Sequence, residues 1–177
     1  MIVSNSINQM FEEMKGWRQE LHSIPEIGLE EYETSKYIKS KLSEFNIEFK
    51  DGYANTGIVA HVKGSKGDSD KSIGLRADFD ALPMPEKNEF KHKSKNEGMM
   101  HACGHDGHTT MLLGAAKYLN ENNDFDGNVY FIFQPGEEGF AGGQKMIQDG
   151  MFDDFKIDEV YALHNWPELP IGSIGVN

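Results

Sequence analysis

Residues 108–135, HTTMLLGAAKYLNENNDFDGNVYFIFQP, contain a helix pattern followed directly by a buried strand pattern. Apolar residues recur at helical spacing in the first half, which predicts a helix over about 108–120. The second half, NVYFIFQP, is an apolar run that ends at Pro135, as expected for a buried strand. A helix that leads into a buried strand is the repeating unit of an α/β protein.

The rest of the chain alternates between helix and strand patterns in the same way. We expect further helices at 6–22, 30–45 and 142–149, and strands at 47–50, 57–63, 72–77, 159–164 and 172–176, with 159–164 buried. Residues 83–100 are polar, contain two prolines and show no period, so they predict a long loop. The predicted fold is α/β: a mixed, mostly parallel sheet with helices on both faces.

The composition narrows the class of protein. The 177 residues include 29 acidic and 17 basic side chains, for a formal net charge of −12, which argues against nucleic acid or an anionic membrane as a partner. The single cysteine cannot form an internal disulfide. The sequence shows no secretory signal pattern and no apolar stretch near the roughly 20 residues of a membrane span. We therefore expect a cytoplasmic protein.

Polar clusters follow the predicted strands and should meet at one edge of the sheet. In a parallel α/β sheet the carboxyl ends of the strands converge, and ligands bind there. Residues far apart in the sequence then become neighbours. The clusters are RADFDAL at 76–82, HACGHDGH at 101–108, QPGEEG at 134–139 and HNWP at 164–167.

HACGHDGH is the densest cluster, with Cys103, three histidines and one aspartate in eight residues. Cys103 and His105 are two residues apart, so in extended backbone both side chains point the same way and can reach one metal ion or two adjacent ones. A thiolate and an imidazole suit zinc and similar ions. The structural alternative is a buried cysteine with surface histidines, which the density of the cluster disfavours.

QPGEEG places Glu137 and Glu138 directly after a buried strand. Neighbouring side chains point in different directions, so one carboxylate can bind a metal ion while the other accepts a proton from the reacting water. The alternative for this pair is a solvated acidic turn. His164 ends an apolar strand at the same predicted edge, which makes it a candidate ligand, although a lone histidine at a strand end is more often structural.

Asp78 and Asp80 are also two residues apart and can face one way. Asp80 is placed to orient a metal-bound histidine as a hydrogen-bond acceptor. Asp78 either joins it or, as the structural alternative, pairs with Arg76 or caps a turn. His22 and Glu26 lie four residues apart, but a proline between them interrupts the helix that would align them, so we expect no joint site there.

The motifs of this chain resemble those of the N-acyl-amino-acid amidohydrolases. That group contains aminoacylase-like enzymes, hippurate hydrolases and plant auxin-conjugate hydrolases, within the wider co-catalytic metallopeptidase superfamily. The resemblance covers the chain from about residue 14 and rests on five motifs taken together. They are LHSIPEIGLEE, LRADFDALPM, MHACGHDGHTTMLLGAA, FQPGEEGFAGG and ALHNWPELPIGSIGV, in this order.

The resemblance implies a site with two divalent metal ions, zinc or manganese. It implies that Glu137 is the general base and that the metal ligands are Cys103, His105, Glu138 and His164. We expect Asp80, Asp78 and His101 to support these ligands. Relatives with a His-x-Asp first motif differ, because this chain has Arg-Ala-Asp-Phe-Asp at 76–80. That difference fits the branch in which cysteine and histidine supply the first ligands.

The resemblance also implies a zinc-exopeptidase-like catalytic domain of which residues 1–177 are the N-terminal part. Family members continue into a lid or dimerisation domain, form homodimers and supply a last histidine ligand near their C-terminus. The leading hypothesis is hydrolysis of N-acyl amino acids to a carboxylate and an amino acid. Two alternatives stay open: a truncated metal-binding module without turnover, and a dipeptidase on the same scaffold. A thiol-nucleophile enzyme would leave the glutamate pair without a role.

Overall fold

The computed structural model describes residues 5–176 of the chain. Three helices and three strands come first, and helical and strand segments alternate after them. In chain order the elements are α1 (Asn5–Gln9), α2 (Phe11–Ser23), α3 (Tyr32–Glu44), β1 (Glu48–Tyr53), β2 (Gly57–Lys63), β3 (Ser72–Asp78), α4 (His105–Glu121), β4 (Asn128–Gln134), α5 (Gly142–Gln148), α6 (Met151–Asp154) and β5 (Glu159–Ala162).

The five strands form one sheet in the order β1-β2-β4-β3-β5. β3 pairs in parallel with β4 and with β5, whereas β2 pairs antiparallel with β1 and with β4. Four strands therefore run in one direction and β2 alone runs in the other. The predicted mixed, mostly parallel sheet is confirmed. Its parallel half brings the carboxyl ends of β3, β4 and β5 to the same edge.

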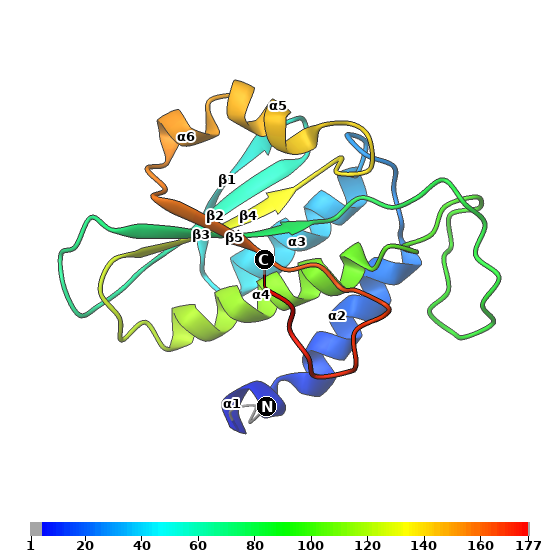
Figure 1. Cartoon of the computed structure of the whole chain (residues 1–177), viewed down its shortest axis with the longest axis horizontal. Helices are drawn as coiled ribbons and strands as arrows, with labels where there is room; N and C mark the ends of the chain where they lie inside the picture. The colour runs from blue at the N-terminus through cyan, green and yellow to red at the C-terminus, as the bar shows by residue number, and fades with distance from the viewer. Residues whose placement is uncertain (1–4, 177) are drawn as a thin grey trace.

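Helices cover both faces of the sheet, as predicted (Figure 1). α3 and α4 lie against one face with α2 packed on α4, and α5 and α6 lie on the other. The strands contribute side chains to both cores, because successive side chains point to opposite faces of the sheet. On β4, Phe131 and Phe133 enter the core under α3 and α4, whereas Ile132 enters the smaller core under α5 and α6.

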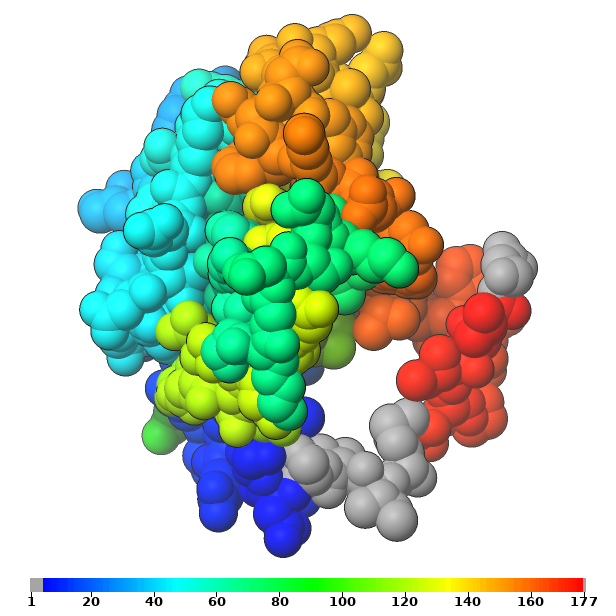
Figure 2. All heavy atoms as spheres, turned by 90° about the vertical axis from the view of Figure 1, so that its left-hand side faces the viewer, coloured from blue at the N-terminus to red at the C-terminus, as the bar shows by residue number. Residues whose placement is uncertain are grey.

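The C-terminal part of the chain departs from the prediction. Strand β5 ends at Ala162 and all four of its residues are exposed, so the predicted buried strand at 159–164 is shorter and not buried. β5 is an edge strand that pairs only with β3, and no described helix covers it. The predicted strand at 172–176 is not formed within the described residues. This end of the chain borders an apolar cleft of about 490 Å³ beside β3 and α4 (Figure 2).

Two boundary differences matter for the site. The single helix predicted at 6–22 is two helices, α1 and α2, which are separated at Met10. The helix predicted from His108 starts at His105, three residues earlier.

Residues 83–100 are a loop as predicted, closed by paired backbone hydrogen bonds between Leu82 and Met100. None of the described helices is long and apolar enough to cross a membrane.

Candidate metal centre

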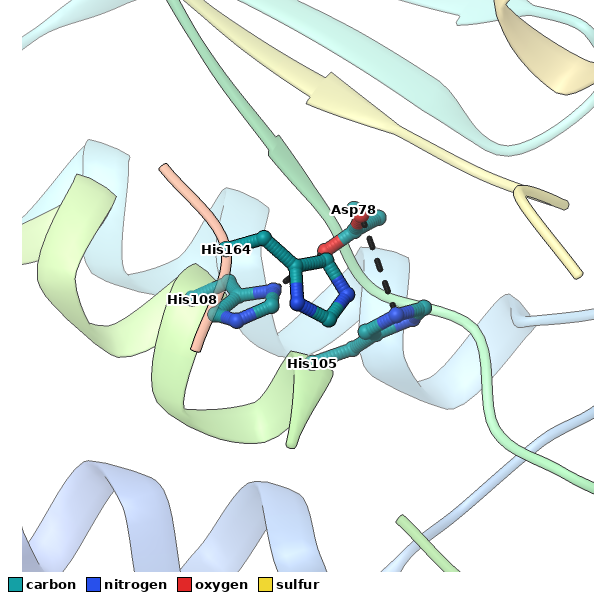
Figure 3. Close-up of side chains that lie close together, drawn as sticks. All are labelled: Asp78, His105, His108 and His164. Carbon is teal, nitrogen blue, oxygen red and sulfur yellow. Dashed lines mark hydrogen bonds and ion pairs between the residues drawn. The ribbon is translucent and has the colours of Figure 1, made fainter. Parts of the chain in front are cut away.

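The predicted polar clusters meet at the carboxyl edge of β3, β4 and β5. Asp78 is the last residue of β3, and Glu137 and Glu138 lie in the loop after β4. His164 follows β5, and His105 opens α4. Figure 3 shows the rings of His105, His108 and His164 gathered around the Asp78 carboxylate. The convergence expected from a parallel sheet is therefore present.

His105 has one ring nitrogen in use and one open. Its Nδ1 atom lies 2.9 Å from the backbone oxygen of Asp80 and 3.2 Å from that residue's Oδ1. A carbonyl oxygen only accepts, so Nδ1 carries the proton and donates. The Nε2 atom is fully buried and has no hydrogen-bond partner among the described residues. A buried, unpartnered ring nitrogen is the state of a histidine that is ready to bind a metal ion.

The open nitrogen of His105 faces two further donors of the predicted set. Ligand atoms of Cys103, His105 and Glu138 all lie within 4.8 Å of one another. The Cys103 Sγ atom is also 3.6 Å from Nε2 of His164, whose Nδ1 donates to the backbone oxygen of Asn165 at 2.7 Å. Sulfur, imidazole and carboxylate in this proximity form a donor set suited to zinc and similar ions.

The local backbone differs from the one that the sequence argument assumed. Gly104 is in the left-handed region, with φ of 88°, and His105 is already helical, so Cys103 and His105 do not share an extended segment. The two side chains meet because the chain turns sharply at Gly104. A Cβ atom there would also lie 2.7 Å from Oδ1 of Asn165. Glycine is therefore required both for the turn and for the close approach of the segment with His164.

Two buried carboxylates accept hydrogen bonds from the backbone of the loop that contains Glu137 and Glu138. Glu31, which is fully buried, accepts from the backbone N–H of Gly136 at 2.8 Å and from the Thr56 hydroxyl at 2.7 Å. Asp80 accepts from the backbone N–H of Glu138 at 2.9 Å. Asp80 thus orients both His105 and the glutamate loop, which is the type of contact predicted for it.

Glu137 and Glu138 present their carboxylates differently. The Glu138 side chain is 26% exposed, and its Oε1 lies 3.9 Å from Nε2 of His105. The Glu137 side chain is 42% exposed, and its Oε2 lies 4.0 Å from the same nitrogen. The Glu138 side chain is thus less exposed than the Glu137 side chain, although both carboxylates lie at about the same distance from His105.

Negative charge is in excess at this edge. Burial raises the pKa of the Cys103 thiol to about 11, and the neighbouring Glu138, Asp78 and Glu137 act in the same direction. Burial lowers the pKa of His105, but Asp80, Asp78 and Glu138 outweigh it, and the pKa rises overall. Carboxylates contribute to both shifts, and negative charge therefore accumulates around these two side chains. A bound divalent cation would neutralise it, so charge and donor chemistry both fit a metal ion.

His108 belongs to the site, although it was not among the predicted site residues. Asp78, His105, His108 and His164 form a second group of possible ligands within 4.8 Å of one another. Asp78 accepts from Nδ1 of His108 at 2.7 Å and from Nη1 of Arg76 at 2.9 Å. These contacts, with His105 nearby, outweigh burial and lower the pKa of Asp78 to about 2. Asp78 therefore pairs with Arg76, which is the structural alternative that the sequence allows.

Asp106 is the sequence feature that could have identified His108, because it predicts that α4 begins near His105. Asp106 is an acidic residue in the first turn, which stabilises a helix N-terminus. With the helix beginning at His105, a residue three positions further lies on the same helical face.

Two other histidines lie outside the possible ligand groups. His101 is buried, and neither of its ring nitrogens has a hydrogen-bond partner in the described part of the chain. Burial lowers its pKa to about 4. His22 lies between carboxylates, 2.8 Å from Asp106 and 3.0 Å from Glu86. Glu26 instead caps the start of α3 through Thr34, so it forms no joint site with His22.

Comparison with known proteins places the chain in a family. Residues 74–177 match the model of peptidase family M20/M25/M40. This chain belongs to that family. Within it, the chain is 51% identical to the hippurate hydrolase of Campylobacter jejuni over 150 residues, which are 85% of this chain and 38% of that protein. It is 44% identical to the N-acetyl-L-cysteine deacetylase of Bacillus subtilis over 177 residues, which are 98% of this chain and 41% of that protein.

A solved family structure shows the same fold. A dinuclear metal-binding peptidase of Bacillus subtilis superposes with a TM-score of 0.89 at 40% identity, over 96% of this chain and 47% of that one. The chain thus spans about two fifths of the length of the curated relatives named above. The predicted relationship to amidohydrolases of this superfamily is confirmed.

Proposed function

We propose that the protein with this chain hydrolyses the amide bond of N-acyl amino acids and releases a carboxylate and an amino acid. The observation that carries the proposal is the open Nε2 atom of buried His105, which faces the Cys103 thiol and the Glu138 carboxylate. The family supports the reaction type. The C. jejuni relative is a hippurate hydrolase and the B. subtilis relative an N-acetyl-L-cysteine deacetylase, so both names describe amides of this class.

Two divalent ions, zinc or manganese, are the proposed cofactors. Their ligands in this chain are Cys103, His105, Glu138 and His164, and the dinuclear relative from B. subtilis supports the number of ions. When bound, the ions lower the pKa of the reacting water and polarise the substrate carbonyl. Asp80 holds the His105 ring and the Glu138 backbone in place through its two hydrogen bonds.

Glu137 is the proposed general base. Its carboxylate is the more exposed of the pair and lies at the rim of the cluster, 4.0 Å from His105. There it takes a proton from the attacking water and passes it to the amide nitrogen as the bond to the amino acid breaks. The thiol of Cys103 is the less suitable nucleophile, because its raised pKa keeps it protonated near neutral pH in the absence of a cation.

The domain organisation is part of the proposal. We place residues 1–177 in the N-terminal part of the metallohydrolase catalytic domain, with a lid or dimerisation domain and a C-terminal catalytic segment elsewhere in the whole protein. The shares of 38% and 41% of the curated relatives that the chain spans support this reading. A homodimer and a cytoplasmic location stay predictions.

A hydrolysis assay with added metal tests the proposal. Metal-free full-length protein receives zinc or manganese and is offered hippurate, N-acetylcysteine or glycylglycine, and free amine is measured. Release from the acyl amino acids supports the proposal, and release from glycylglycine alone favours the dipeptidase. Tight metal binding without any release favours a metal-binding module. A protein that neither binds metal nor releases amine would defeat the proposal.

A further inference from the structure

His108 is a buried histidine in the first turn of α4, close to the residues at the carboxyl edge of the sheet. His108 is 3% exposed. The centroid of its ring lies 4.6 Å from that of the His164 ring and 5.4 Å from that of the His105 ring. Figure 3 shows its ring beside the His164 ring, with an interaction to the Asp78 carboxylate. Position alone would make it a further metal ligand, because its ligand atom lies within 4.8 Å of those of Asp78, His105 and His164.

Hydrogen bonding excludes the ligand role in this arrangement. Nε2 of His108 lies 3.1 Å from the backbone nitrogen of Asn165, which can only donate, so Nε2 accepts. Nδ1 then carries the proton and donates to Oδ1 of Asp78 at 2.7 Å. Both ring nitrogens are used, and neither has a lone pair left for an ion. The second oxygen of Asp78 accepts from Arg76 at 2.9 Å, so Asp78 is occupied as well.

The partner of Nε2 is the residue directly after His164. His164 is exposed and lies beyond the end of the edge strand β5, where no described helix covers the chain. α4, by contrast, is a 17-residue helix with a buried face. The hydrogen bond from Asn165 to His108 therefore ties an exposed segment to a rigid element, one residue away from a proposed ligand.

We infer that His108 is a positioning residue: by accepting the Asn165 N–H, it fixes the backbone that presents His164 to the metal centre. The inference rests on the proposed function, because it assigns His164 to the ligands. Asp78 accepts the hydrogen bond of His108 Nδ1, which leaves Nε2 free to accept from Asn165. Arg76 in turn donates a hydrogen bond to Asp78. Residues behind a ligand that fix its orientation commonly change metal affinity by about 10–100-fold when they are replaced.

Two amide substitutions separate the two hydrogen bonds of His108. Asparagine places an NH₂ group near the position of Nδ1 and can still donate to Asp78, but it does not reach Asn165. Glutamine extends to the position of Nε2 and can still accept from Asn165. We expect His108→Asn to weaken zinc binding by about 10–100-fold, and His108→Gln to restore most of the affinity.

The measurement is zinc titration of the metal-free full-length protein against a chromophoric chelator. His61→Asn is the matched control, because His61 is a half-buried histidine on β2 whose Nε2 hydrogen-bonds to Asn128, away from the strand edge. It should bind zinc as the wild type does. Far-ultraviolet circular dichroism and thermal melting show whether each variant is folded.

The outcomes distinguish this inference from the proposed function. A wild type that binds no zinc defeats the proposed function itself. If the wild type binds zinc and His108→Asn binds it equally well, the positioning role is wrong. Equal weakening by His108→Asn and His108→Gln also overturns it, because the contact with Asp78 would then matter instead of the contact with Asn165.

A second measurement needs no substitution and decides the matter if His108→Asn does not fold. In the wild type loaded with ¹¹³Cd, coupling between cadmium and ring nitrogens identifies the coordinating histidines. Coupling to His164 without coupling to His108, whose proton stays on Nδ1, supports the inference. Coupling to His108 makes it a ligand and overturns the inference.

Discussion

Nδ1 of His105 donates to the backbone oxygen of Asp80 at 2.9 Å, and this hydrogen bond decides which nitrogen of His105 is open. The carboxylate of Asp80 strengthens the arrangement, because one oxygen lies 3.2 Å from the same Nδ1 and the other accepts from the Glu138 N–H. One buried residue thus orients two of the proposed ligands, although it is not a ligand itself.

Replacing Asp80 should therefore weaken metal binding without removing a ligand. We expect Asp80→Ala to lower zinc affinity by about 10–100-fold, since the His105 ring and the glutamate loop lose a shared acceptor. Chelator competition on the full-length protein measures the change. Asp70→Ala, at an exposed aspartate in the turn between β2 and β3, is the control and should leave the affinity unchanged. Unchanged affinity in Asp80→Ala would contradict the orienting role.

The two adjacent glutamates should separate into different phenotypes. We expect Glu137→Gln to lower turnover by at least about 10²-fold with nearly unchanged metal content, because a general base is lost but no ligand. Glu138→Gln should instead lower metal affinity. Metal analysis and an amine-release assay on both variants test the assignment. Loss of metal in Glu137→Gln would make that residue a ligand and reverse the roles.

Glu31 should stabilise the loop that presents those glutamates. Removal of its carboxylate leaves the Gly136 N–H and the Thr56 hydroxyl without their buried acceptor. We expect Glu31→Ala to lower the free energy of unfolding by about 1–3 kcal/mol for each group left unsatisfied. Urea denaturation measures it. Glu33→Ala, at an exposed position on α3, should change stability by less than about 0.5 kcal/mol, and an equally small effect in Glu31→Ala would be inconsistent with the structural role.

His22 should make stability depend on pH. Its hydrogen bond to Asp106 raises its pKa; burial acts in the opposite direction, and Glu86 adds to the rise. A histidine whose pKa is higher in the folded state adds stability below its unfolded pKa of about 6.5 and loses it as pH rises through the folded value. The stability difference between wild type and His22→Gln should therefore be largest near pH 6 and shrink toward pH 9. A difference that grows with pH in urea denaturation would show that the neutral ring is the stabilising form.

Two glycines should respond in opposite ways to the same substitution. A Cβ atom on Gly142 would lie 1.7 Å from the backbone oxygen of Pro135, so the turn before the glutamates must move. We expect Gly142→Ala to cost about 1–3 kcal/mol. Gly16 is inside α2, and apart from its own helix backbone and chain neighbours nothing lies within 4 Å of its Cβ position, so Gly16→Ala should stabilise by about 0.5–1 kcal/mol. Thermal melts of both variants check the signs.

The elements of this fold follow from local patterns, and the sequence predicts most of them. The apolar run before Pro135 becomes β4, and the helical spacing before it becomes α4. The prediction is less accurate where burial depends on neighbours. The apolar residues of β5 read as a buried strand, but its place at the sheet edge leaves them exposed. Periodicity reports which residues are apolar, and the sheet order decides which of them are covered.

For the candidate site too, the sequence predicts one part and the tertiary structure decides the other. By itself, the sequence determined that the glutamate pair and His164 follow strands of an α/β sheet, and that Cys103 and His105 belong to a polar cluster expected at the same edge. Only the tertiary structure decided which atoms are open. His105 keeps Nε2 free because Asp80 takes Nδ1, and His108 has none free because Asp78 and Asn165 take both nitrogens. The hydrogen-bond partners lie 25 to 57 residues away in the chain, and no local pattern encodes a contact at that distance.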